Sequence, residues 1–143
     1  MNRTEIDREA LVRKAIEART HAYAPYSNYR VGAAVQMEDG EIYTGANVEN
    51  AVYPLCICAE RSAVASAVST GARRIAAIAV ATRNAGSPCG SCRQVIREFA
   101  EPETPVLITD LEGRYRERTV EELLPESFSV QDLEVAQDAS LPK

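Results

Sequence analysis

The chain has no tryptophan, two phenylalanines and a single histidine, His21, among its 143 residues. One histidine, near the end of an N-terminal helical pattern, leaves hydrolytic triads that need a histidine base with one poorly placed candidate. No apolar run approaches the roughly 20 residues needed to span a bilayer. The N-terminal segment also lacks the apolar core of a signal peptide. We therefore expect no membrane partner and a cytoplasmic location.

An excess of basic charge is also missing. The formal net charge is -5, and no run of Lys or Arg is longer than a pair. Binding to a nucleic-acid polymer is therefore not expected, because counterion release needs a basic face. A small neutral ligand is compatible with this balance. The length and the ordinary hydrophobic fraction of 45% predict a single domain over residues 1–143.

Four cysteines stand in the spacing C-x-C and then C-x-x-C. Without an export signal this spacing favours metal binding over disulfides. Cys58, Cys89 and Cys92, together with Glu60, predict a zinc site with three thiolate ligands, one open position and a carboxylate beside it. A closed site that recruits Cys56 is disfavoured, because residues i and i+2 of an extended segment lie about 6.6 Å apart. Cys56 is expected to pack or to line the wall.

Hydrophobic periodicity and turn signals predict helices, strands and hairpins in a regular order. The predicted elements are a helix over 4–22, strands over 29–38 and 41–45, a helix over 58–70, a strand over 75–81, a second cysteine-headed helix that reaches Phe99, strands over 105–110 and 115–118, and a short helix capped by Thr119 and Glu122. The short connection between the last two strands makes them antiparallel. The fold class is therefore an α/β/α sandwich with a mixed five-stranded sheet. A flexible tail is expected from about residue 131.

Both cysteine segments begin a predicted helix, where backbone N–H groups favour thiolates. Three thiolates around Zn²⁺ leave a net charge of -1, so a cation should offset it. Arg61 and Arg93 are the candidates, and Arg61 is preferred. The polar stretch that contains Asn47 and Glu49 has two interpretations, a solvated turn or a group that binds a sugar hydroxyl.

Five segments in order carry a family resemblance. They are Tyr26-Ser27-x-Tyr29-x-Val31-Gly32-Ala33-Ala34, Asn47-Val48-Glu49-Asn50-Ala51, Cys58-Ala59-Glu60-Arg61, 87–95 and Leu123-Leu124-Pro125-x-x-Phe128. Over residues 1–133 the chain resembles the small, tetrameric cytidine deaminases, which belong to the zinc deaminases. The resemblance implies hydrolytic deamination of cytidine and 2'-deoxycytidine to the uridine forms with release of ammonia, in pyrimidine salvage.

The resemblance also implies roles for single residues. Cys58, Cys89 and Cys92 would bind one zinc ion per subunit, and zinc-bound hydroxide would attack C4 of the pyrimidine. Glu60 would take the proton of the water, deliver it to N3 and help ammonia leave. The backbone of Ala59 would meet the edge of the base.

Further residues would complete the nucleoside pocket. Asn47 and Glu49 would hold the ribose 3'-hydroxyl, and Tyr29 would stack on the base or wall the pocket. Phe128 would reach into the site of a neighbouring subunit, so that a homotetramer shares its active sites. The family usually has Phe where this chain has Tyr29, and the added hydroxyl leaves the substrate range open.

Two rivals stay open at this point. One is a related deaminase tuned to a modified nucleoside or to a nucleoside antibiotic such as blasticidin S, although the Asn47 and Glu49 pair favours an ordinary ribose. The other is a non-catalytic, zinc-stabilised binding module, which predicts a closed metal site and no use for Glu60.

Overall fold

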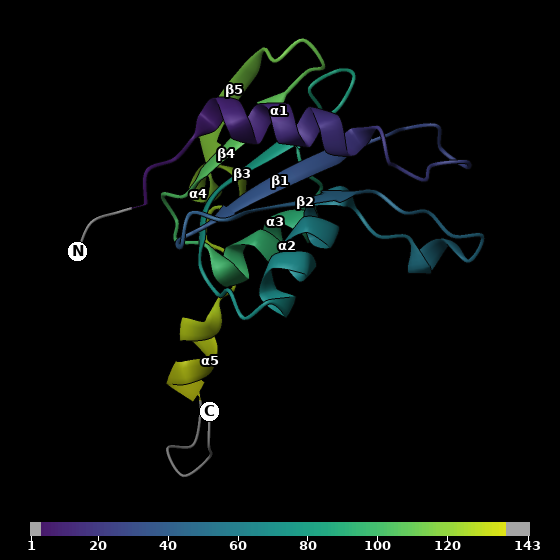
Figure 1. The fold of residues 1–143 in the computed structure, drawn as a ribbon. Helices are drawn as coiled ribbons and strands as arrows, with labels where there is room; N and C mark the ends of the chain where they lie inside the picture. Colours follow the sequence, from purple (N-terminus) through teal and green to yellow (C-terminus); the bar gives the residue numbers. More distant parts are fainter. Residues whose placement is uncertain (1–3, 137–143) are drawn as a thin grey trace.

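The computed structural model describes residues 4–136 (Figure 1). The elements are α1 (Arg8–Arg19), β1 (Gly32–Met37), β2 (Ile42–Ala46), the 3-10 helix η1 (Tyr53–Leu55), α2 (Ala59–Ser69), β3 (Ile75–Ala81), α3 (Gly90–Phe99), β4 (Pro105–Thr109), β5 (Tyr115–Thr119), α4 (Val120–Leu123) and α5 (Val130–Ala136). The predicted order of helices, strands and hairpins is confirmed, and η1 and α5 are additions to it.

The five strands form one mixed sheet in the order β2-β1-β3-β4-β5. Strands β3 and β4 are parallel, and the other three neighbouring pairs are antiparallel. Helix α1 covers one face of the sheet, and α2 and α3 lie side by side on the other (Figure 1). The predicted three-layer α/β/α sandwich, with its last two strands antiparallel, is confirmed.

Each face of the sheet has its own hydrophobic core. On the α1 face, Leu11 and Ala15 pack against alternate residues of the central strands, such as Ala79. On the opposite face, Ala63 and Val64 of α2 pack against the other set. All of β3 except Ala76 is buried, as expected for a strand that is covered on both faces.

Two glycines let the helices approach the hairpin formed by β1 and β2. A side chain at Gly32 would collide with the backbone of α1 at Ala15 and Arg19. A Cβ at Gly45 would lie 2.7 Å from the carbonyl oxygen of Ala59 in α2. The close approach that the sequence predicted at Gly32 is therefore confirmed, and the approaching backbone is that of α1.

Three predicted boundaries were wrong by three or more residues. The first helix begins at Arg8 rather than residue 4, because Asp7 is its N-cap and accepts a hydrogen bond from the Ala10 N–H (3.0 Å). It ends at Arg19 rather than residue 22. The first strand begins at Gly32 rather than residue 29.

The late start of β1 has a side-chain cause. The Asn47 side chain accepts a hydrogen bond from the Val31 N–H (2.9 Å) and donates one to the Tyr29 carbonyl (2.8 Å). These backbone groups are therefore bonded by an amide side chain and not by a neighbouring strand.

The end of the described chain is helical. Residues 130–136 form α5, where the sequence predicted a flexible tail from about 131, and residues 137–143 of that predicted tail lie outside the described residues. Within residues 4–136 no helix has the length and apolar character required to cross a bilayer.

Candidate metal centre and active site

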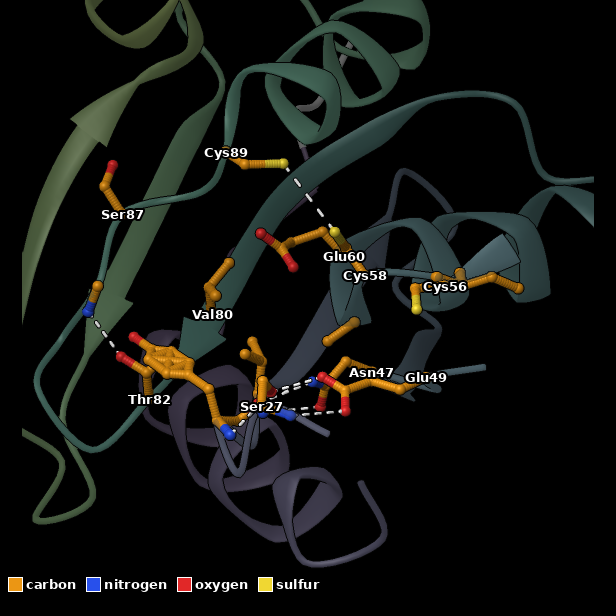
Figure 2. A pocket seen from close by; sticks show the side chains of 15 residues that line it. Ser27, Asn47, Glu49, Cys56, Cys58, Glu60, Val80, Thr82, Ser87 and Cys89 are labelled. Atoms are coloured by element: carbon orange, nitrogen blue, oxygen red, sulfur yellow. Dashed lines mark hydrogen bonds between the residues drawn. The ribbon is translucent and has the colours of Figure 1, made fainter. Parts of the chain in front are cut away.

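Three of the four cysteines meet at one end of the sheet. The sulfur atoms of Cys58, Cys89 and Cys92 all lie within 4.8 Å of one another, and 4.0 Å separates Cys58 Sγ from Cys89 Sγ (Figure 2). Tetrahedral zinc with Zn–S bonds of about 2.3 Å requires ligand sulfurs about 3.8 Å apart. The cluster could therefore hold a metal ion, and its thiol donors suit zinc.

The cluster is assembled by two helix starts. Cys58 is the N-cap of α2 and Cys89 is the N-cap of α3, and neither side chain caps its own helix. Cys92 lies in the first turn of α3, with no exposed surface. The sulfurs therefore lie at two helix N-termini, where the first N–H groups and the positive end of the helix dipole favour negative charge.

The thiols differ in acidity. Hydrogen bonds from Cys92 and Cys89 and the charge of Arg61 lower the pKa of Cys58 to about 6. The hydrogen bond to Cys58, followed by burial, raises the pKa of Cys92 above its usual range. A shared proton network of this kind is expected where three sulfur ligands are held together.

A buried carboxyl group stands beside the sulfurs. Glu60 lies in the first turn of α2 with 4% of its surface exposed. Burial is the main cause that raises the pKa of Glu60, and the neighbouring charge of Cys58 adds to it. A carboxyl with a raised pKa next to a metal-binding cluster is suited to proton transfer.

A cavity of about 280 Å³ opens over this centre. Its walls come from five parts of the chain: Ser27, Tyr29 and Val31; Asn47 and Glu49; Cys56 to Glu60; Val80 and Thr82; and Gly86, Ser87 and Cys89. The predicted residues Cys58, Cys89, Glu60, Ala59, Tyr29, Asn47 and Glu49 therefore meet in one cavity, and buried Cys92 lies beneath it. Figure 2 shows the sulfurs at one end and Asn47 and Glu49 at the other.

The far end of the cavity is tied to the metal centre through the backbone. Val48 and Ile57 exchange two N–H···O hydrogen bonds of 2.9 Å, and Tyr23 pairs with Val48 from the other side. Ile57 immediately precedes Cys58. The positions of Asn47 and Glu49 relative to the sulfurs are therefore fixed by a short ladder of main-chain bonds.

Glu49 also organises a wall of the cavity. Its carboxylate accepts hydrogen bonds from the N–H groups of Tyr26 (2.9 Å) and Ser27 (3.1 Å) and from the Ser27 hydroxyl. These bonds, above all the one from the Ser27 hydroxyl, hold the pKa of Glu49 below its usual value. The sequence analysis assigned no role to Ser27, although this residue belongs to the motif Tyr26-Ser27-x-Tyr29.

The two candidate arginines differ. Arg93 donates to Pro88 O (2.7 Å), Leu123 O (2.7 Å) and Ser87 Oγ (2.8 Å), so its guanidinium braces the loop before Cys89. Arg61 is exposed, and its charge contributes to the lowered pKa of Cys58. This difference supports the preference for Arg61 as the charge partner, which remains a prediction.

Phe128 and Cys56 are the two remaining residues for which the sequence predicted a place. Phe128 is 59% exposed and does not line the cavity of its own chain within the described residues. The Cys56 thiol lines the cavity and bonds to the backbone of Asn50, accepting from its N–H at 3.3 Å. Cys56 also lies outside the three-sulfur cluster among the residues that the structure describes.

Comparison with known proteins agrees with this geometry. Residues 5–108 match the family model for the "cytidine and deoxycytidylate deaminase zinc-binding region". The chain belongs to this deaminase family. A cytidine deaminase of Halalkalibacterium halodurans is 48% identical over 130 residues, which cover 90% of this chain and 98% of that protein. A cytidine deaminase of Mycobacterium tuberculosis is 40% identical over 131 residues, or 90% and 95% of the two chains.

Solved structures of the cytidine and deoxycytidylate deaminase family have the same fold. A cytidine deaminase from Burkholderia pseudomallei superimposes with a TM-score of 0.81 at 46% identity, covering 86% of this chain and all of that one. The chain is thus a zinc-dependent enzyme of this family, as its motifs predicted.

Proposed function

We propose that the protein hydrolyses cytidine and 2'-deoxycytidine to uridine and 2'-deoxyuridine and releases ammonia, as a step of pyrimidine salvage. The observation that carries the proposal is the buried Glu60 carboxyl beside the three sulfurs, at the floor of a cavity whose other end is lined by Asn47 and Glu49. Curated relatives at 40–49% identity are named cytidine deaminases.

In this proposal Cys58, Cys89 and Cys92 would hold the zinc ion, which when bound would supply Lewis-acid activation of water near neutral pH. The N-termini of α2 and α3, together with Arg61, offset the negative charge of the three thiolates.

Glu60 moves the protons. It takes one proton from water as the oxygen bonds to C4, and it delivers that proton to ring atom N3. It then takes the second proton of the added oxygen and passes it to the amino group, so that the C4–N bond breaks and ammonia leaves. The raised pKa of Glu60 suits a carboxyl that must both hold and release a proton.

Asn47 and Glu49 bind the ribose 3'-hydroxyl. Asn47 Nδ2 donates to the Tyr29 carbonyl with one of its two N–H groups, and in this proposal the other donates to the substrate. Glu49 Oε2 accepts from the Ser27 hydroxyl and retains a further lone pair. One donor and one acceptor side by side match a single hydroxyl group, which both accepts and donates.

The assembly proposed is a homotetramer with shared sites. The segment 48–57 carries a group of exposed apolar side chains that would be poorly placed in an isolated chain. They are Val48, Val52, Tyr53, Leu55 and Ile57, with exposed fractions between 42% and 69%. The exposure of Phe128 supports its insertion into the site of a neighbouring subunit.

A substrate panel followed by ultraviolet absorbance tests the reaction. We expect turnover of cytidine and deoxycytidine, and no turnover of cytosine or adenosine. A preference for blasticidin S would instead favour the relative tuned to a nucleoside antibiotic. No turnover of any compound by zinc-loaded protein would favour the non-catalytic module.

The Glu60→Gln variant tests the mechanism. We expect it to retain about one zinc per chain by metal analysis and to lose activity by a factor of about 10³ or more. Glu98→Gln, an exposed change on α3, is the matched control and should keep normal turnover. Full activity of Glu60→Gln would remove Glu60 from the reaction.

A further inference from the structure

A short loop, residues 82–86, contacts Tyr29 from more than one side. The reaction proposed above gives these contacts no role. The Tyr29 hydroxyl donates a hydrogen bond of 2.7 Å to Asn84 Oδ1. The guanidinium carbon of Arg83 lies 5.5 Å from the centre of the Tyr29 ring. The ring is therefore held both at its tip and over one face, and it lines the cavity in that position.

The loop is itself a fixed structure. Thr82, which is 3% exposed, accepts a hydrogen bond from the Gly86 N–H (2.6 Å) and donates one to Asn84 Oδ1 (3.2 Å). Arg116 of β5 donates to the Ala85 carbonyl (3.0 Å). The acceptor of the Tyr29 hydroxyl is thus anchored to the sheet on two sides.

Gly86 provides the space that the hydroxyl needs. A Cβ at this position would lie 2.5 Å from Tyr29 Oη, which is too close, and 3.4 Å from Thr82 Oγ1. Gly86 does not have the positive φ of Gly40, Gly71 or Gly113, so its backbone conformation does not itself require glycine. The constraint at residue 86 comes from the tyrosine hydroxyl.

We propose that the loop 82–86 clamps Tyr29 through its hydroxyl and so limits the room beside C5 of the pyrimidine. This inference rests on the proposed function, in which C4 lies at the sulfurs and N3 at Glu60. C5 is the other ring neighbour of C4, so it points away from Glu60. Figure 2 shows Thr82 and Ser87 across the cavity from Glu60, on the side of the loop.

The clamp therefore determines specificity. With the hydroxyl bonded to Asn84, a tilt of the ring away from the cavity would break that bond, and the polar atom of the side chain is paired with a residue outside the cavity lining. A methyl group at C5 of cytosine would therefore clash with the Tyr29 ring. Loss of this hydrogen bond would keep the aromatic ring in the cavity wall but would allow the ring to tilt.

The test compares kcat/KM for 5-methylcytidine with that for cytidine, using the zinc-loaded enzyme. Removing the clamp by Tyr29→Phe should raise this ratio by about tenfold, the lower end of the discrimination that one carbon controls in an apolar pocket. Asn84→Ala breaks the same bond and should have the same effect, and the two changes together should add little. Tyr115→Phe removes an exposed hydroxyl on β5, outside the cavity, and should leave the ratio unchanged.

Gly86→Ala provides an independent measurement. In the otherwise unaltered chain its Cβ should displace Tyr29 and lower kcat/KM for cytidine, whereas in the Tyr29→Phe background the same change should be tolerated. A ratio of kcat/KM values that changes by less than about twofold in both Tyr29→Phe and Asn84→Ala would overturn the clamp while cytidine turnover stands. Absence of cytidine turnover in the unaltered enzyme would overturn the proposed function, and the clamp with it.

Discussion

Helices α2 and α3 both begin at a cysteine of the metal centre and pack into the same hydrophobic core, yet their other contacts differ. Helix α2 rests on the sheet through Ala59, Ala63 and Ala67, none of which has exposed surface. Helix α3 is bonded to the C-terminal segment by polar side chains. Arg97 donates to Ser127 Oγ (3.1 Å), and Gln94 donates to the carbonyl of Phe128 (2.9 Å).

The difference follows what each helix carries. Helix α2 positions Glu60, which must move protons over short distances, and a backbone packed directly on a strand has little freedom to shift. Helix α3 provides two of the sulfurs and is connected to the segment that ends at Phe128. In the proposed tetramer, α3 would therefore link the metal centre to the subunit interface.

The largest loss of stability should come from a side chain placed in the close contact between α2 and β2. Gly45→Ala places a Cβ against the backbone of Ala59 and Ala63, which cannot rotate away. We expect a loss of about 3 kcal/mol in the free energy of unfolding and weaker retention of zinc. Gly90→Ala at the start of α3 meets no atom within 4 Å and is the control. Equal stability of the two variants in denaturant would contradict the steric account of α2.

A smaller loss should follow from cutting the polar anchors of α3. Arg93→Ala removes three hydrogen bonds that brace Pro88, Ser87 and Leu123, and it should cost about 2 kcal/mol in unfolding free energy. Arg93→Lys keeps the charge but cannot span all three acceptors, so it should recover only part of the loss. Recovery of full stability by lysine would show that charge, and not the bracing geometry, is what Arg93 contributes.

The smallest loss of stability is expected for Arg61 of α2, because its exposed side chain contributes charge and no packing. Arg61→Ala should lower kcat/KM about tenfold, as is typical for partners of metal ligands. The unfolding free energy should change by less than about 0.5 kcal/mol, because the side chain is exposed. Arg13→Ala on α1, across the sheet, controls for loss of a surface cation. An unchanged rate at neutral pH would remove Arg61 from the site.

The sequence predicted the metal centre better than the pocket walls. Cys58, Glu60, Cys89 and Cys92 belong to two short segments with recognisable spacing, and each segment opens a helix whose apolar pattern is clear. Local sequence therefore contains most of what determines their geometry. Strands β3 and β4, which precede and follow α3 in the chain, were also predicted from local sequence patterns.

The walls depend on contacts between distant segments. Tyr29 and Asn84 are 55 residues apart, and Ser27 and Glu49 are 22 apart. Such partners are selected by the tertiary fold, which a pattern of polar residues does not specify. The late start of β1 at Gly32 has the same origin, because Asn47 bonds to the backbone of Tyr29 and Val31, where a strand partner was expected.

Both helices begin at a cysteine of the cluster, so the first N–H groups of α2 and α3 lie at the helix ends that carry the sulfurs. Part of the positive potential at the metal centre therefore belongs to the main chain, which every amino acid other than proline preserves. The centre is buffered against mutation in a way that a ring of lysines or arginines would not be. Side chains around the cavity can diverge to admit new substrates while the electrostatic requirement of the metal stays satisfied.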